Sequence, residues 1–168
     1  MADYIVKFFK GAKTHHNLDI SHTGIWNEKP YEINWIKPLQ NTLNPNGLAS
    51  MKIVAADQFA QSDKWPIVDE MNADPALKVA IDVVGVHYVA GQSTPAARSI
   101  GKPLWASEDG PWSGAWGNDR NMAMLQRIYN RGYINGQMTK TLIWSPITAY
   151  YDNLLLSSSG LMRANTPR

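Results

Sequence analysis

The chain has 168 residues, which suits one domain or a piece of a larger one. Its formal net charge of +2, without a cluster of lysine and arginine, argues against a nucleic-acid partner. It contains no cysteine, which excludes disulfides and thiolate metal sites within the chain. We expect no transmembrane segment, because Asp82 interrupts even the most apolar stretch, and the N-terminus lacks the features of a signal peptide.

The first part of the chain predicts a helix, a strand and a second helix. Apolar residues recur at helical spacing near the N-terminus, which predicts a helix that ends at about residue 16. Residues 19–30 form a short run of apolar, small and β-branched side chains, which predicts a buried strand that delivers Asn27 and Glu28 at its end. A helix with an internal proline is expected over residues 31–43.

The rest of the chain continues the alternation of apolar strands and helices. The predicted strands cover residues 51–57, 83–88, 102–109 and 139–146. The predicted helices cover residues 64–77 with a break at Asp74-Pro75, a short stretch at 95–98, and residues 118–133, and a loop is expected at 157–160.

This alternation predicts a parallel sheet covered by helices. Polar residues follow the strands at their carboxyl ends, where (β/α)₈ barrels place their chemistry. A doubly wound sheet is disfavoured because no Gly-rich first loop is present. A full barrel needs roughly 250 residues. We therefore predict that residues 1–168 form the later part of a (β/α)₈ TIM barrel, about strands 4 to 8 with their helices, with no second domain.

Two glutamates at predicted strand ends are the candidate catalytic groups. Glu28 and Glu108 are two of four glutamates in the chain and lie 80 residues apart, three strand–helix units by our assignment. Cleavage of a glycosidic bond uses a pair of carboxyl groups, about 5–5.5 Å apart in retaining enzymes and farther apart in inverting ones. Spacing in the sequence cannot separate these two cases. Trp26 offers a ring face for a sugar, although a tryptophan can equally fill a core.

Several segments, in this order and spacing, resemble glycoside hydrolase family fifty-nine. The likeness covers almost the whole chain. Its main motifs are GIWNE at 24–28, VVGVHY at 83–88, LWASED at 104–109 and YINGQMT at 133–139, followed by Trp144, AYY at 149–151 and GLM at 160–162.

The resemblance implies retaining hydrolysis that removes terminal β-galactose from galactosylceramide-type glycolipids by double displacement. It assigns Glu28 as the acid/base and Glu108 as the nucleophile. It assigns substrate contacts to Asn27, which would hold the sugar 2-hydroxyl, to His87 and Tyr88 near the nucleophile, and to Trp144, which would stack on the sugar. No metal and no cofactor is implied.

The resemblance also carries expectations about the setting of the enzyme. It implies a lysosomal or secreted hydrolase of sphingolipid degradation, with a saposin-like, lipid-presenting protein as a candidate partner. The family's first three barrel strands and its C-terminal domains have no counterpart in this chain, so we expect the isolated chain to be poorly active. Two alternatives stay open: a non-catalytic carbohydrate-binding fragment, and a β-glucosidase or β-xylosidase of the same barrel clan.

Overall fold

The computed structural model describes residues 1–59, 65–89, 91–110, 119–144, 147–148 and 162–163. Five parallel strands form one sheet in the order β1-β2-β3-β4-β5, which is also their order in the chain. The strands are β1 (His22–Gly24), β2 (Lys52–Phe59), β3 (Val83–His87), β4 (Leu104–Asp109) and β5 (Met138–Ile143). Two short strands, β6 (Ile147–Thr148) and β7 (Met162–Arg163), pair separately with each other.

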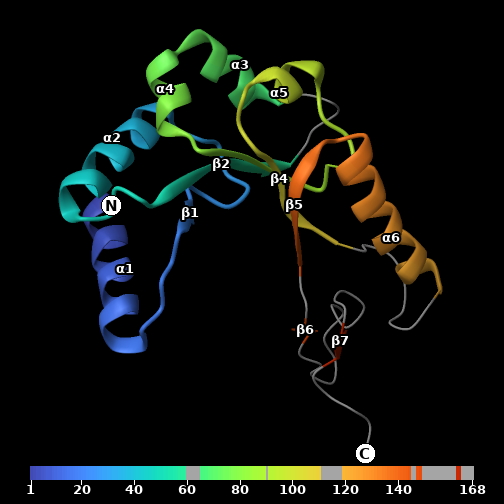
Figure 1. The fold of residues 1–168 in the computed structure, drawn as a ribbon, viewed down its shortest axis with the longest axis horizontal. Coiled ribbons are helices and arrows are strands. Elements are labelled where there is room, and N and C mark those ends of the chain that lie inside the picture. Colours follow the sequence, from blue (N-terminus) through green and yellow to red (C-terminus); the bar gives the residue numbers. More distant parts are fainter. Residues whose placement is uncertain (60–64, 90, 111–118, 145–146, 149–161, 164–168) are drawn as a thin grey trace, which may run out of the picture.

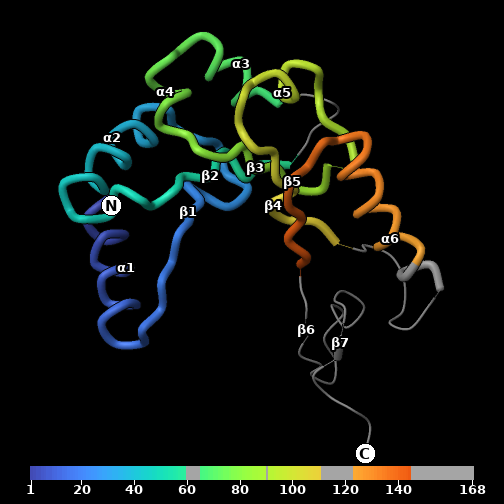
Figure 2. The backbone as a smooth tube through the Cα atoms, in the orientation of Figure 1, coloured from blue at the N-terminus to red at the C-terminus, as the bar shows by residue number. Residues whose placement is uncertain are grey.

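Helices connect the strands and lie around the outside of the curved sheet (Figure 1). They are α1 (Ala2–His16), α2 (Ile33–Leu43), the 3₁₀ helix η1 (Asn44–Asn46), α3 (Pro66–Ala73), α4 (Pro75–Ala80), α5 (Pro95–Ser99) and α6 (Asp119–Ile134). The backbone trace shows the same half-barrel, with α1 and α6 at opposite ends of the arc (Figure 2). No helix in the described part of the chain is long and apolar enough to span a membrane.

The break between α3 and α4 has a local cause. Asp74 leaves helical geometry, and its side chain accepts hydrogen bonds from the backbone N–H groups of Ala76 and Leu77. Pro75 occupies the first position of α4, where a helix needs no backbone donor. The predicted break at Asp74-Pro75 is confirmed.

The core lies between the sheet and the helices. β3 is buried along its whole length, and the central residues of β2 are buried as well. Strands that are apolar on both faces are typical of parallel sheets, so the sequence pattern and the packing agree. The largest fully buried side chains from helices are Ile36, Leu39 and Leu43 of α2, Ile67, Val68 and Met71 of α3, and Leu77 of α4.

One strand prediction is wrong in its extent. Only His22–Gly24 of residues 19–30 pairs with β2, and the residues that follow form a loop. The Asp57 carboxyl lies beside Gly24, where even a Cβ atom would come within 2.6 Å of Asp57 Oδ2. The pairing with β2 ends at Gly24, and Glu28 stands in a loop instead of at the end of the strand.

The other predicted strands and helices that fall within the described residues are confirmed to within a few residues. The end of the predicted strand at 145–146, the loop at 157–160 and the motif at 149–151 lie outside the described residues.

Candidate active site

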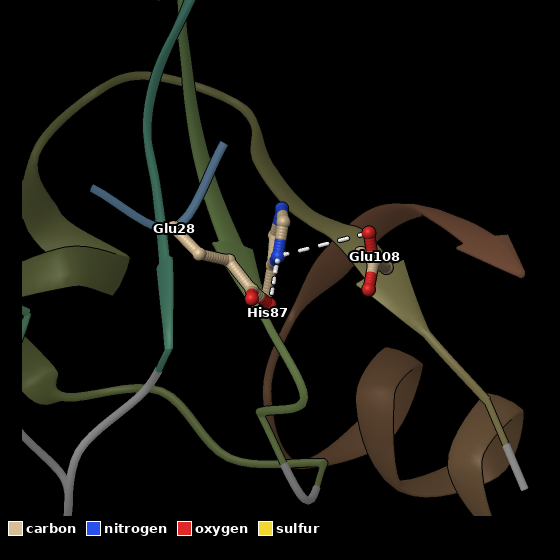
Figure 3. A group of neighbouring side chains, drawn as sticks. All are labelled: Glu28, His87 and Glu108. Carbon is tan, nitrogen blue, oxygen red and sulfur yellow. Dashed lines mark hydrogen bonds and ion pairs between the residues drawn. The ribbon is translucent and has the colours of Figure 1, made fainter. Parts of the chain in front are cut away.

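Glu28, His87 and Glu108 meet at the carboxyl edge of the sheet (Figure 3). His87 ends β3, Glu108 lies near the end of β4, and Glu28 arrives from the loop after β1. The His87 Nδ1 atom is 2.9 Å from Glu28 Oε1 and 3.9 Å from Glu108 Oε2. One carboxylate oxygen of each glutamate and a ring nitrogen of His87 all lie within 4.8 Å of one another. The structure thus brings together two carboxyl groups that the sequence separates by 80 residues.

The three side chains of this cluster differ in their exposure to solvent. The side chains of Glu28 and Glu108 are 28% and 19% exposed, whereas that of His87 is 3% exposed. The two glutamates are therefore partly exposed, while the imidazole of His87 is buried.

Tyr88 holds the Glu108 carboxylate. Its hydroxyl donates a hydrogen bond of 2.7 Å to Glu108 Oε1, and its backbone N–H donates to the backbone carbonyl of Glu108 at 2.8 Å. Burial, together with the bond to Glu108, raises the pKa of the Tyr88 phenol well above its usual range. The raised pKa favours the protonated phenol, which is the form that donates to Glu108. The Tyr88 ring stacks on Phe59, with the ring centroids 5.3 Å apart.

The backbone around these side chains adopts an uncommon conformation. Glu28, Asp57 and Tyr88 have φ values of 54°, 53° and 49°, in the left-handed region that residues other than glycine seldom occupy. The pairing of β2 with β3 shifts register between Ala56 and Gln58, which is a bulge at Asp57. Bulges and left-handed residues re-aim side chains, and they are over-represented near active sites.

The loop that carries Glu28 is fastened to β2. The Glu28 N–H donates to the Asp57 carbonyl at 2.9 Å, and the Gln58 side-chain amide donates to the Lys29 carbonyl at 2.8 Å. These two bonds fix the position of the loop relative to the sheet.

Asp57 lies next to the histidine, and sequence reasoning did not single it out beyond placing it at the end of a strand. It is 9% exposed, accepts a hydrogen bond of 2.5 Å from the Ser107 hydroxyl, and has Oδ1 3.8 Å from His87 Nε2. Burial raises the pKa of Asp57, opposed by the Ser107 bond and the nearby His87. Its place after an apolar strand was the available signal.

A second buried carboxyl follows the nucleophile candidate. Asp109 is 4% exposed, and its Oδ1 accepts a hydrogen bond from the Gly110 N–H at 2.8 Å. Its Oδ2 has no partner among the described residues. Burial raises the pKa of Asp109.

The remaining predicted substrate residues lie on the loops around this cluster. Asn27 is exposed beside Glu28. Trp26 is 54% exposed and lines an apolar pocket with Tyr31 and Trp35. Trp144 is 60% exposed after β5, and its backbone N–H donates to the Asp109 carbonyl at 2.8 Å. Of the predicted site residues, the structure thus brings Glu28, His87, Tyr88 and Glu108 into one cluster of contacts and leaves the other three exposed on neighbouring loops.

Glu28, His87 and Glu108 are also the three described residues whose donor atoms lie close enough to share a cation. However, His87 Nδ1 and Glu28 Oε1 already face each other at hydrogen-bond distance. A hydrogen bond therefore joins them, with donor and acceptor roles that depend on the tautomer of His87. The geometry therefore fits an acid–base cluster.

A pair of carboxyl groups at the carboxyl edge of a parallel sheet is the arrangement of glycosidases built on barrels. Solved structures share this fold. The chain superposes on the catalytic domain of GH30 xylanase C from Talaromyces cellulolyticus with a TM-score of 0.76 and 18% identity, over 98% of this chain and 41% of that one. SrfJ from Salmonella typhimurium gives a TM-score of 0.70 at 17% identity, over 88% of this chain and 37% of that one.

The family model described as Glycosyl hydrolase family 59 matches residues 1–168, and the chain belongs to this family. It is 39% identical over 166 residues to a galactocerebrosidase of Danio rerio and 40% identical over 166 residues to one of Homo sapiens. Each alignment covers 99% of this chain, but 24% and 23% of those relatives. The chain thus spans about a quarter of the length of the curated relatives that it matches.

Proposed function

We propose that this chain carries the acid/base and the nucleophile of a retaining glycosidase. The observation that carries the proposal is the position of Glu28 and Glu108, with an oxygen of each within 4.8 Å of the other. Retaining enzymes hold their carboxyl groups about 5–5.5 Å apart, whereas inverting enzymes need about 6.5–9.5 Å to admit a water molecule between acid and base. The close approach favours the retaining reaction.

The two glutamates would act in two steps. Glu108, ionised and held by the Tyr88 hydroxyl, attacks the anomeric carbon, while Glu28 gives its proton to the leaving oxygen. This forms a glycosyl ester on Glu108 and releases the aglycone. Glu28 then takes a proton from water, whose oxygen attacks the anomeric carbon and frees Glu108.

We propose a terminal β-galactoside of the galactosylceramide type as substrate. This rests on membership of family 59 and on relatives named galactocerebrosidase. In this proposal Asn27 binds the sugar 2-hydroxyl, and Trp26 and Trp144 offer ring faces to the substrate. The wider setting follows from the same family: a lysosomal or secreted enzyme of sphingolipid degradation, helped by a lipid-presenting protein.

We also propose that residues 1–168 correspond to strands 4 to 8 of a (β/α)₈ catalytic barrel. Among the described strands, β1 pairs only with β2 and β5 only with β4, so each has a free edge. Unpaired edges leave backbone donors and acceptors without partners. We therefore expect the 168-residue chain by itself to turn over substrate more slowly than an enzyme with a closed barrel.

An activated 2-deoxy-2-fluoro-β-galactoside tests the nucleophile directly, because it accumulates the glycosyl ester. We expect mass spectrometry to find the label on the peptide that contains Glu108, and Glu108→Gln to abolish it. Glu70→Gln, which changes an exposed glutamate of α3, is the matched control and should label normally.

The anomer of the first product, read by proton NMR, separates the two reaction types. β-Galactose supports the proposal, and α-galactose would refute it in favour of inversion. A panel of aryl β-galactoside, β-glucoside and β-xyloside tests the sugar. Faster hydrolysis of a glucoside or xyloside would show that the galactoside assignment is wrong. Binding of the sugar without labelling of Glu108 and without release of the aglycone would show that the chain binds carbohydrate but does not cleave it.

A further inference from the structure

The Asp57 carboxyl occupies a space that the neighbouring strands leave for it. A Cβ atom on Gly24 of β1 would lie 2.6 Å from Asp57 Oδ2, and one on Gly85 of β3 would lie 2.7 Å from Asp57 Oδ1. Real Cβ atoms do not approach other atoms so closely. The strands on both sides of β2 therefore carry glycine where the carboxyl lies.

The backbone also turns Asp57 toward this space. Ala56 pairs with Gly85 and Gln58 pairs with Val86, so that Asp57 is passed over in the ladder. A buried aspartate at a bulge with a left-handed backbone has no advantage for packing, since both features cost free energy. Their combination at one residue next to the candidate active site indicates a role in that site.

Asp57 connects to Glu28 through His87. The Ser107 hydroxyl donates to Asp57 Oδ1, and the same oxygen is 3.8 Å from His87 Nε2. The other ring nitrogen, Nδ1, is 2.9 Å from Glu28 Oε1. Side chains from β4, β2 and β3 thus form one line that ends at the proposed acid/base.

We infer that Asp57 is a positioning residue, whose carboxylate selects the Nε2–H tautomer of His87 and thereby keeps the transferable proton on Glu28. A neutral imidazole has one N–H donor and one acceptor nitrogen. A carboxylate facing Nε2 stabilises the hydrogen there, which leaves Nδ1 as an acceptor. In a neutral imidazole the hydrogen between Nδ1 and Glu28 then belongs to Glu28, as a general acid requires, whereas an imidazolium with a hydrogen on each nitrogen would leave Glu28 ionised.

Other charged groups around the His87 imidazole also influence which ring nitrogen carries the hydrogen. Glu28 faces His87 from the loop after β1, and Glu108 faces it from β4 at 3.9 Å. Asp109 of β4 also interacts with His87 electrostatically. Burial raises the pKa of Asp57, so its carboxylate forms at a higher pH than an exposed aspartate would require. The tautomer should therefore become fixed as the pH rises through the titration of Asp57.

NMR of the ¹⁵N-labelled 168-residue chain can read this tautomer without substrate. Long-range ¹H–¹⁵N correlations distinguish protonated from unprotonated ring nitrogens, the chain has four histidines, and His87→Gln assigns the relevant signals. At neutral pH we expect the wild-type His87 to carry its hydrogen on Nε2. In Asp57→Asn, which keeps the shape but removes the charge, we expect the ratio of Nδ1–H to Nε2–H to rise roughly tenfold, because Nε2–H loses the negative charge that lies 3.8 Å away.

Asp82→Asn is the matched control. Asp82 also accepts a hydrogen bond from the sheet, from the Ile53 N–H at 2.9 Å, but at the opposite end of the strands. It should leave the His87 signals unchanged. A wild-type His87 with its hydrogen on Nδ1, or with hydrogens on both ring nitrogens, would overturn the inference, even if Asp57→Asn did not fold. An unchanged tautomer ratio in a folded Asp57→Asn would overturn it as well.

A kinetic comparison of the purified protein separates positioning from general destabilisation. A galactoside with a poor leaving group needs the proton of Glu28, whereas one with a dinitrophenolate leaving group does not. We expect Asp57→Asn to slow the first roughly tenfold or more and the second little. Equal losses on both would indicate a structural role and refute the inference. The inference rests on the proposed acid role of Glu28. The NMR measurement of the His87 tautomer does not depend on the labelling of Glu108, so the inference and the proposed function can fail separately.

Discussion

Removal of one oxygen atom from Tyr88 tests how the proposed nucleophile, Glu108, is supported. In Tyr88→Phe the ring keeps its stacking on Phe59, while Glu108 loses the donor that lies 2.7 Å from its Oε1. The Glu108 side chain is 19% exposed, so water can replace this donor only in part. The carboxylate then loses both an anchor for its orientation and a partner for its charge.

The structure sets the size of the effect. A hydrogen bond to a charged group contributes about 1.5–3 kcal/mol. Because 1.36 kcal/mol corresponds to a factor of ten in rate, the change should lower kcat/KM roughly 10- to 150-fold. We expect the loss in kcat more than in KM, since the bond serves the reacting carboxylate and not the resting contacts of the sugar.

The assay is hydrolysis of an aryl β-galactoside by the purified protein, together with the rate at which the fluoro-sugar labels Glu108. Tyr133→Phe, which removes the same atom from a side chain of α6 that is 75% exposed, is the control and should behave as wild type. If Tyr88→Phe keeps wild-type kcat/KM and wild-type labelling, the assignment of Glu108 as a nucleophile supported by Tyr88 is wrong.

Three further predictions concern stability. Gly85→Ala should lower the free energy of unfolding by about 1–3 kcal/mol, because its Cβ would press on Asp57 and two further side chains. Gly11→Ala, whose Cβ would make only an ordinary contact in α1, should raise the free energy of unfolding by about 0.5–1 kcal/mol. Thermal unfolding checks both signs. Asp57→Asn should be more stable than wild type at neutral pH. Burial raises the pKa of Asp57 in the folded state, so wild type loses stability as the pH rises from the unfolded pKa of about 3.9 through the folded pKa. The loss is about 1.4 kcal/mol for each pH unit between these two pKa values. Urea unfolding of both proteins at pH 4 and pH 8 measures this, and a stability difference between wild type and Asp57→Asn that is the same at both pH values would contradict it. Asp74→Ala should destabilise the chain at neutral pH by removing the cap of α4 and the ion pair with Lys37. That deficit should vanish as the pH falls through the lowered pKa of Asp74, and a deficit that persisted in acid would show that the charge is not its cause.

The order and type of the secondary-structure elements follow from local features of the sequence. The apolar runs of β2 and β3, the helical periodicity of α1 and α6, and the Asp74-Pro75 break each depend on neighbouring residues, and each is confirmed. The length of β1 does not follow, because it depends on how far the chain pairs with β2, a strand that lies elsewhere in the sequence.

The sequence by itself determined that this chain is a parallel strand–helix protein, and its motifs indicated the family that the comparison bears out. These are properties of periodicity, composition and short motifs, which a chain displays without folding. Only the tertiary structure decided that Glu28 and Glu108 approach each other across His87, that Tyr88 binds Glu108, and that Asp57 lies behind the imidazole. Such contacts depend on the bulge and the left-handed residues that orient each side chain. They also depend on the curvature of the sheet, which brings the carboxyl ends of β3 and β4 and the loop after β1 close to His87. The physical reason is that the strength of a hydrogen bond changes over tenths of an ångström, whereas spacing in the sequence indicates only which strand, helix or loop a residue belongs to.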